Sequence, residues 1–241
     1  MATGHERLLL FGASGAIGSS IMEMALGRGW EVTAVGRKAP DTKDSAHSKA
    51  RWIVADPLAA GFDKEHLRGE QPYASVCWAQ GTNCNDSVYD MDAARHQEVY
   101  DANCTYILVT LQALLTGGML EQGSRLCVIS SIWQEMARQN KLSYCMSKAA
   151  LRGLVLSAAA DLAKDGHCIN AVLPGALDTP MTRKNLTAEQ MQRIEGGTLF
   201  GALPKLEDVA RTVCHLCSHE STGVTGQFIA VDLGYSNVRI I

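Results

Sequence analysis

The chain has 241 residues, of which 46% are hydrophobic, and is therefore long enough to bury a large core. Its formal net charge is −3 and its basic residues are scattered, which argues against nucleic acid or an anionic membrane as a partner. No apolar stretch approaches the roughly 20 residues that span a bilayer, and the first residues lack a signal-peptide pattern. Eight cysteines without such a signal indicate reduced thiols, so we expect a cytoplasmic protein.

Short apolar runs alternate with helical patterns along the whole chain. We expect strands at 7–12, 30–36, 50–56, 72–81, 124–131, 168–175 and 226–232, and helices at 16–29, 96–118, 143–166 and 206–218. The strands are continuous apolar runs, as a parallel sheet covered by helices on both faces requires. The sequence therefore predicts a doubly wound α/β fold that forms one domain over residues 1–241.

The segment GASGAIG, residues 12–18, lies between the first expected strand and the first expected helix. Its glycines would allow a sharp turn and let a pyrophosphate approach the helix N-terminus, where free N–H groups favour an anion. A tight turn without a ligand is the alternative. We expect a dinucleotide to contact Gly12, Ser14, Gly15, Ile17 and Gly18.

The second expected strand ends in VGRKAP, with Arg37 and no acidic residue before Asp41. In NAD-binding folds an acidic residue about 20 positions after the glycine turn holds the ribose 2′-hydroxyl. A guanidinium suits a 2′-phosphate instead, because it can bind bidentately. A solvated basic turn is the alternative, but the pattern favours NADP(H) over NAD(H).

The stretch SYCMSKAA places Tyr144 and Lys148 one helical turn apart. A nearby ammonium favours phenolate and lowers the tyrosine pKa from about 10, which would make Tyr144 a general acid or base. An ordinary helix with one aromatic residue and one surface lysine is the alternative.

Two later segments are open to two interpretations. Helix formers bracketed by glycines between Thr182 and Leu203 indicate either a mobile substrate lid, at about 181–204, or a surface helix. The pair Cys214 and Cys217 lies in an apolar helical pattern and has no second ligand pair elsewhere, so we expect packing and no metal site.

Several motifs occur together in one order. They are GASGAIG, Ser131 thirteen residues before Tyr144, Lys148 one turn later, NAVLPGALDTPM at 170–181, and VTGQFIAVDLG at 224–234. In these the chain resembles the short-chain dehydrogenase/reductase family over essentially its whole length. The resemblance implies a Rossmann fold and an active-site asparagine at Asn103. It also implies an acid beside the adenine at Asp56 and a nicotinamide-clasping segment with Pro174, Gly175 and Thr179.

The chain also departs from the family pattern. Its second glycine falls at position 15, where the family's commonest pattern would place one at 16. The family's Asn-Asn-Ala-Gly is WAQG here, residues 78–81, of which we expect Ala79 and Gly81 to contact the cofactor. The family's final Asp-Gly-Gly is Asp-Leu-Gly. These differences indicate a divergent member.

The resemblance implies an NADP(H)-dependent oxidoreductase that transfers a hydride between nicotinamide and a carbonyl or secondary alcohol. Tyr144 would protonate the oxygen in reduction and act as the base in oxidation. Ser131 would donate a hydrogen bond to that oxygen, with Ser130 as its competitor for the role. Lys148 would lower the tyrosine pKa and hold the ribose hydroxyls. Asn103 would support a water-linked proton path, or only satisfy backbone groups as a buried amide.

The expected partner is a small carbonyl or alcohol substrate. Arg138, Gln139 and Asn140, with Trp133 and Gln134, favour a polar compound unless these residues face solvent. Apolar faces on two helices, over 105–115 and 149–163, together with the family's habit, suggest a homodimer or homotetramer. The alternatives are a non-catalytic NADP(H)-binding sensor and a dehydratase or epimerase acting on a nucleotide-linked sugar.

Overall fold

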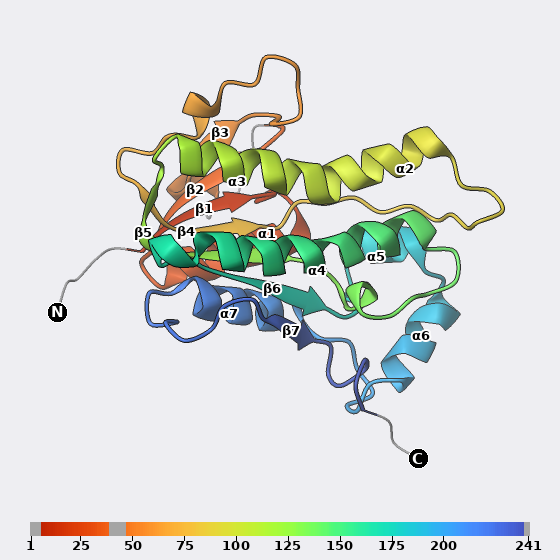
Figure 1. Ribbon diagram of the computed structural model, residues 1–241. Helices are drawn as coiled ribbons and strands as arrows, with labels where there is room; N and C mark the ends of the chain where they lie inside the picture. The colour runs from red at the N-terminus through yellow and green to blue at the C-terminus, as the bar shows by residue number, and fades with distance from the viewer. Residues whose placement is uncertain (1–5, 39–46, 239–241) are drawn as a thin grey trace.

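Seven strands form one parallel sheet in a computed structural model that describes residues 6–38 and 47–238 (Figure 1). The strands are β1 Arg7–Phe11, β2 Glu31–Gly36, β3 Arg51–Val54, β4 Tyr73–Trp78, β5 Leu120–Ile129, β6 Cys168–Pro174 and β7 Phe228–Val231. Their order across the sheet is β3-β2-β1-β4-β5-β6-β7, and every neighbouring pair is parallel. The order reverses between β1 and β4, which opens a crevice at the carboxyl ends of these strands.

The strand sequences are apolar because both faces of the sheet are covered. In β1, Leu8 and Leu10 point into one core while Leu9 and Phe11 point into the other, and all four are fully buried. Alternate residues of a strand face opposite sides of the sheet. The predicted doubly wound α/β fold is therefore confirmed.

Two helical layers close the two cores. Helices α1 (Ala16–Gly27) and α7 (Leu206–Cys217) pack on one face. Helices α3 (Tyr106–Thr116) and α4 (Leu142–Leu162) pack on the other. Cys214 and Cys217 are fully buried in the first of these cores, and all eight cysteines are free thiols.

The single long helix predicted over 96–118 is interrupted. It comprises α2 (Ala93–Tyr100), a wide π-helical turn at Asp101–Thr105, and α3. Nothing in the sequence marks the interruption, because residues 101–105 contain neither glycine nor proline. Such turns place one extra residue in a helix and are frequent at functional sites.

The remaining helices are short and lie near the carboxyl edge of the sheet or in connections. The segment expected to be a lid contains α5 (Pro180–Asn185) and α6 (Ala188–Gly196). The connections carry the 3₁₀ turns His47–Lys49, Lys64–Leu67, Ile132–Gln134 and Ala163–Asp165. Among the described helices, none has the length and apolar character needed to cross a bilayer.

Helix α4 is fixed at both ends by local chemistry. Asp86 accepts a hydrogen bond from the backbone N–H of Ser143 at 3.0 Å, which satisfies a donor of the first turn. The helix ends in a 3₁₀ turn followed by Gly166, whose φ of 73° is the left-handed conformation that glycine tolerates. Tyr144 therefore lies in a first turn whose position is well determined.

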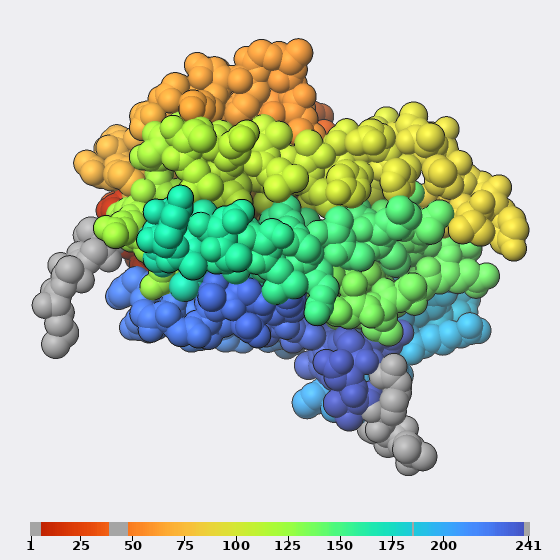
Figure 2. Space-filling view, in the orientation of Figure 1, coloured from red at the N-terminus to blue at the C-terminus, as the bar shows by residue number. Residues whose placement is uncertain are grey.

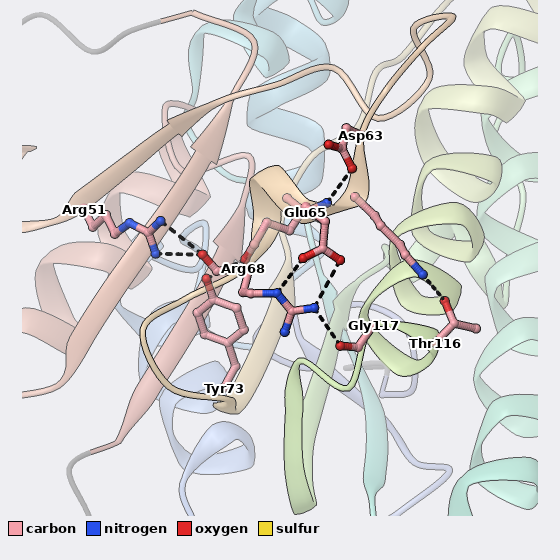
Figure 3. A network of polar contacts seen from close by, with 9 residues as sticks. Arg51, Asp63, Glu65, Arg68, Tyr73, Thr116 and Gly117 are labelled. Carbon is pink, nitrogen blue, oxygen red and sulfur yellow. Dashed lines mark hydrogen bonds and ion pairs between the residues drawn. The ribbon is translucent and has the colours of Figure 1, made fainter.

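A polar network ties the amino edge of the sheet together (Figure 3). Arg51, at the start of β3, donates two hydrogen bonds of 3.1 Å to the carbonyl of Arg68. The Arg68 guanidinium in turn pairs with Glu65 at 2.6 Å and donates to the carbonyl of Gly117 at 3.0 Å. The hydroxyl of Tyr73 donates to the carbonyl of Leu67 at 2.8 Å. The connection between β3 and β4 is thereby fixed against the end of α3.

Candidate active site

A cleft of about 930 Å³ opens at the carboxyl edge of the sheet, on the side opposite this network. Residues that directly follow β1, β2, β4, β5 and β6 line it. This is the crevice that the reversal of strand order creates. Its volume is within the usual range for a small-molecule or cofactor site.

The glycine turn forms one wall of the cleft by close backbone packing. Gly12 has a φ of +74°, and a β-carbon there would lie 2.5 Å from the backbone nitrogen of Gln80. A β-carbon on Gly18 would lie 2.2 Å from the carbonyl oxygen of Gly12. Both positions therefore require glycine, and the backbone at the start of α1 is open to a pyrophosphate.

Arg37 and Asp56 lie together at one end of the cleft. Both line it, and both act on the buried hydroxyl of Tyr106: burial raises the pKa of Tyr106, Asp56 raises it further, and Arg37 lowers it. A β-carbon on Gly36 would lie 3.8 Å from the hydroxyl oxygen of Ser14. Ser14 and the end of β2 therefore border the same small region of the cleft. The exposed guanidinium of Arg37 lies in this region, and positions 36–38 contain no acidic residue.

Tyr144 and Ser131 meet at the other end. Ser131 lies just after β5 in an extended conformation and is buried, and its hydroxyl is close enough to that of Tyr144 to lower the tyrosine pKa. The neighbouring Ser130 instead donates to Gln134 at 2.8 Å. The structure therefore brings Ser131, and not Ser130, to the tyrosine.

The pKa of Tyr144 shifts in the direction opposite to the prediction. Although the residue keeps part of its surface exposed at the cleft, desolvation raises its pKa to about 12, and the neighbouring Ser131 hydroxyl only partly offsets this. The Lys148 ammonium lies 5.7 Å from the centre of the tyrosine ring and donates to the carbonyl of Ile129 at 3.0 Å. The prediction that Lys148 lowers the tyrosine pKa below 10 is wrong in this structure, because burial sets the direction of the shift and Lys148 is not among the groups that alter it.

Lys148 is itself buried, with 4% of its surface exposed. Burial lowers the pKa of Lys148 to about 8, and the Cys104 thiol opposes this shift weakly. The structure gives it one carbonyl partner, Ile129, where an ammonium has three donors. It is a cation kept in an apolar setting directly beneath the cleft.

Asn103 lies in the π-helical turn and has its amide occupied. Its Oδ1 accepts from the backbone N–H of Thr82 at 2.8 Å, and its Nδ2 donates to Thr82 O at 3.1 Å and to the Ser147 hydroxyl at 2.8 Å. The wide turn directs the side chain between the end of β4 and helix α4. These contacts match the alternative of a buried amide that satisfies backbone groups.

The structure gathers the predicted site residues at one place. All of the predicted cofactor and catalytic residues line the cleft except Gly18, Asn103 and Lys148. Those three lie just behind its wall: Gly18 packs on Gly12, and the amide of Asn103 and ammonium of Lys148 lie 2.8 and 3.9 Å from where a β-carbon of Gly81 would be. Thr179, Pro174 and Gly175 line the far side after β6.

The substrate residues were predicted only in part. Gln134, Gln139 and Asn140 do not line the cleft, whereas Trp133 and Arg138 do, as do four residues of the expected lid: Met181, Thr182, Leu186 and Ile194. The sequence reasoning missed Lys141, which lines the cleft with its ammonium 5.9 Å from the centre of the Tyr144 ring. Its spacing of three residues from Tyr144 on a helix start was the signal that could have identified it.

Comparisons with known proteins agree with this geometry. A family model described as Enoyl-(Acyl carrier protein) reductase matches residues 73–236. The chain is 29% identical over 240 residues to the uncharacterized oxidoreductase YmfI of Bacillus subtilis, covering 96% of this chain and 99% of that protein. It is 26% identical over 233 residues to the 3-oxoacyl-[acyl-carrier-protein] reductase FabG of Escherichia coli, covering 94% and 95%. The fold also matches that of ElxO with NADP bound, with a TM-score of 0.83, 20% identity, and 96% and 99% of the two chains covered.

Proposed function

Because the chain belongs to the short-chain dehydrogenase/reductase family, we propose that it is an NADP(H)-dependent oxidoreductase in which Tyr144 exchanges a proton with the substrate oxygen. As a member it acts on CH–OH or C=O groups and uses a nicotinamide cofactor. The observation that carries the proposal is that the Ser131 and Tyr144 hydroxyls are neighbours at a dinucleotide-sized cleft, with Lys148 beneath the tyrosine ring.

The protonation of Tyr144 suits reduction. With a pKa of about 12 its hydroxyl keeps its proton at pH 7, so that this proton can be given to a substrate carbonyl. In the complex, Ser131 would turn its own proton to the same carbonyl oxygen, a donor positioned before charge develops. In the oxidising direction Tyr144 would accept the proton.

Lys148 and Asn103 would support this step. Two of the three ammonium donors of Lys148 have no partner among the described residues, and we propose that they hold the ribose hydroxyls. Asn103 holds Thr82 against Ser147 and so positions the backbone around Gly81. We propose that Asn103 positions this backbone. From the same position it would also support a water-linked proton path to Lys148.

The cleft fits NADP(H). The open backbone of the glycine turn would hold the pyrophosphate, with Ile17 beside it. Arg37 and Ser14 would bind a 2′-phosphate, where an NAD-specific site would have an acid, and Asp56 would lie beside the adenine. Ala79 and Gly81 would contact the ribose, and Pro174, Gly175 and Thr179 the nicotinamide. The bound cofactor would supply the hydride.

We extend the proposal to a lid, an assembly and a location. Residues 181–204 would close over the substrate, since α5 and α6 border the cleft. A homodimer or homotetramer would cover α3 and α4, which lie side by side on the surface (Figure 2) and expose Leu108, Met146 and Leu156. Free thiols throughout suit a cytoplasmic location.

The test is a screen of the purified protein with NADPH or NADH against ketones, oxoacyl thioesters and keto-sugars. We expect absorbance at the nicotinamide band to fall with at least one class, faster with NADPH. Arg37→Ala should lower kcat/KM for NADPH about 10-fold or more and change that for NADH little, because only the phosphate contact is lost. Nucleotide binding with no turnover in any class would favour the sensor instead.

A further inference from the structure

Arg138 is a half-buried arginine that has no ion-pair partner among the described residues. It lies in the loop between Ser131 and Tyr144 and lines the cleft. No described residue forms a hydrogen bond, ion pair or ring contact with its guanidinium, and only the Cys145 thiol and the Tyr235 phenol lie near enough to raise its pKa. Burial lowers the pKa of Arg138, as expected for a charge that has lost water and gained no ion pair.

The other arginines show how unusual this is. In the described part of the chain only Arg37, Arg138 and Arg193 lack a hydrogen-bonded partner, and Arg37 and Arg193 are exposed to solvent. A buried charge is normally paired because its desolvation is otherwise uncompensated. Arg138 is therefore the arginine that we expect to bind an anion from outside the chain.

A second cation lies at the same end of the cleft. Lys141 is 3% exposed, and its ammonium donates to Asn83 Oδ1 at 2.8 Å and to the carbonyl of Cys84 at 3.1 Å, so it is fixed in position. Burial, and to a smaller extent the charge of Arg138, lower the pKa of Lys141 to about 8, so the two cations interact electrostatically.

The carboxylates nearest this pair have partners of their own. Glu98 is ion-paired with Arg95 at 2.6 Å. Asp86, whose charge raises the pKa of Lys141, accepts hydrogen bonds from the backbone and the hydroxyl of Ser143. Asp101 accepts from Gln97 and Thr105. Among the described residues, none of these carboxylates forms an ion pair with Arg138.

We propose that Arg138, with Lys141 beside it, binds an oxyanion on the substrate. The substrate class is then a ketone or secondary alcohol that carries a carboxylate, sulfonate or phosphate group, since a guanidinium fork binds such groups bidentately. Trp133, Leu186 and Ile194 supply apolar lining for the carbon skeleton between the anion and the reacting carbon. This inference rests on the proposed function, because it uses Tyr144 to define where reaction occurs.

The experiment compares each acid with its neutral ester under NADPH. The probes are 4-oxopentanoate and methyl 4-oxopentanoate, with longer oxo acids and the matched sulfonates and phosphates as further arms. We expect kcat/KM for the charged probe to exceed that for the ester by about 10- to 100-fold. Arg138→Met should lower kcat/KM for the charged probe to about that for the ester and so remove this preference, and Arg138→Lys should keep part of it.

The control is Arg211→Met, which removes the same charge from α7, where Arg211 pairs with Asp208 outside the cleft. It should keep the full preference. Melting temperature and NADPH binding establish that Arg138→Met is folded. Equal rates for acid and ester in the wild type, or a preference that survives in Arg138→Met, would overturn the anion site while turnover itself upheld the proposed function. No turnover of any probe would contradict the proposed function, and this inference with it.

Discussion

The two edges of the sheet use polar side chains in opposite ways. At the amino edge, Arg51, Glu65 and Arg68 form a network in which guanidinium groups meet carboxylate or carbonyl oxygens (Figure 3). At the carboxyl edge, Lys148 is buried with a pKa of about 8 and Arg138 has no anion.

The presence or absence of an ion-pair partner distinguishes charged groups that stabilise the fold from charged groups that are placed to bind a ligand. An ion-pair partner stabilises the charged form of a group. Glu65 does this for Arg68 and raises the pKa of that guanidinium. Burial without an ion-pair partner favours the neutral form of a group. It lowers the pKa of Lys148 and raises the pKa of Tyr144. Titratable groups in a cleft that have a shifted pKa and no ion-pair partner are typical of functional sites.

The largest effect should come from Tyr144→Phe, which removes the hydroxyl and leaves the ring. We expect kcat to fall about 1,000-fold, because the proton donor is lost, while NADPH binding measured by fluorescence changes little. Tyr89→Phe is the matched control, since Tyr89 is 96% exposed and outside the cleft. Full activity in Tyr144→Phe would end the assignment.

Gly18→Ala should damage the fold at the cleft wall. Its β-carbon would meet the carbonyl oxygen of Gly12 at 2.2 Å, so backbone must move. We expect about 3 kcal/mol of lost stability, a fall in Tm of roughly 6–12 °C, and weaker nucleotide binding.

Gly27→Ala is the control in the same helix, since nothing lies within 4 Å of its β-carbon position. It should leave Tm unchanged or raise it by a few degrees, because alanine favours the helix. Equal Tm values for the two variants would show that the turn tolerates a side chain.

Lys148→Met should abolish turnover yet stabilise the chain at neutral pH. The folded pKa of about 8 lies below the free value of 10.5, a difference worth on the order of 3 kcal/mol against the charged folded state. Below pH 8 both states of the wild type hold the proton, so the folded state carries the full penalty. Between pH 8 and 10.5 only the unfolded state holds it, and wild-type stability rises.

The advantage of Lys148→Met in Tm should therefore shrink from pH 7 to pH 10, although the lost bond to Ile129 reduces it throughout. Thermal melts across this range measure it, with the exposed Lys164→Met as the control. A difference in Tm that does not depend on pH would show that the folded state does not lose stability by burying a protonated Lys148.

Glu65→Gln should have the smallest effect. It removes an exposed ion pair of the amino-edge network, and Arg68 keeps its bond to Gly117. We expect Tm to change by less than about 3 °C and kcat/KM not at all. A large loss of activity would mean that the two edges are coupled.

Sequence reasoning gave the strand and helix order, because apolar periodicity records which faces are buried. It placed Ser131, Tyr144 and the glycine turn together because carboxyl ends of parallel strands share one edge. It missed the π-helical turn at Asp101–Thr105, because no glycine or proline marks these residues.

It also misjudged the pKa of Tyr144, since spacing reports the distance to Lys148 and not the depth of burial. The spacing of Lys141 from Tyr144 is visible in the sequence, but the isolation of Arg138 depends on which side chains the fold brings to the cleft, and the chain order does not contain that.

The central claim is that Tyr144 keeps its proton at neutral pH and is therefore ready to protonate a carbonyl. The most direct measurement is the ultraviolet difference spectrum between the wild type and Tyr144→Phe, titrated upward from pH 7. We predict no tyrosinate signal from Tyr144 up to about pH 11, in keeping with a pKa of about 12. A tyrosinate band that appears below pH 10 would show that Lys148 outweighs burial and would contradict the account.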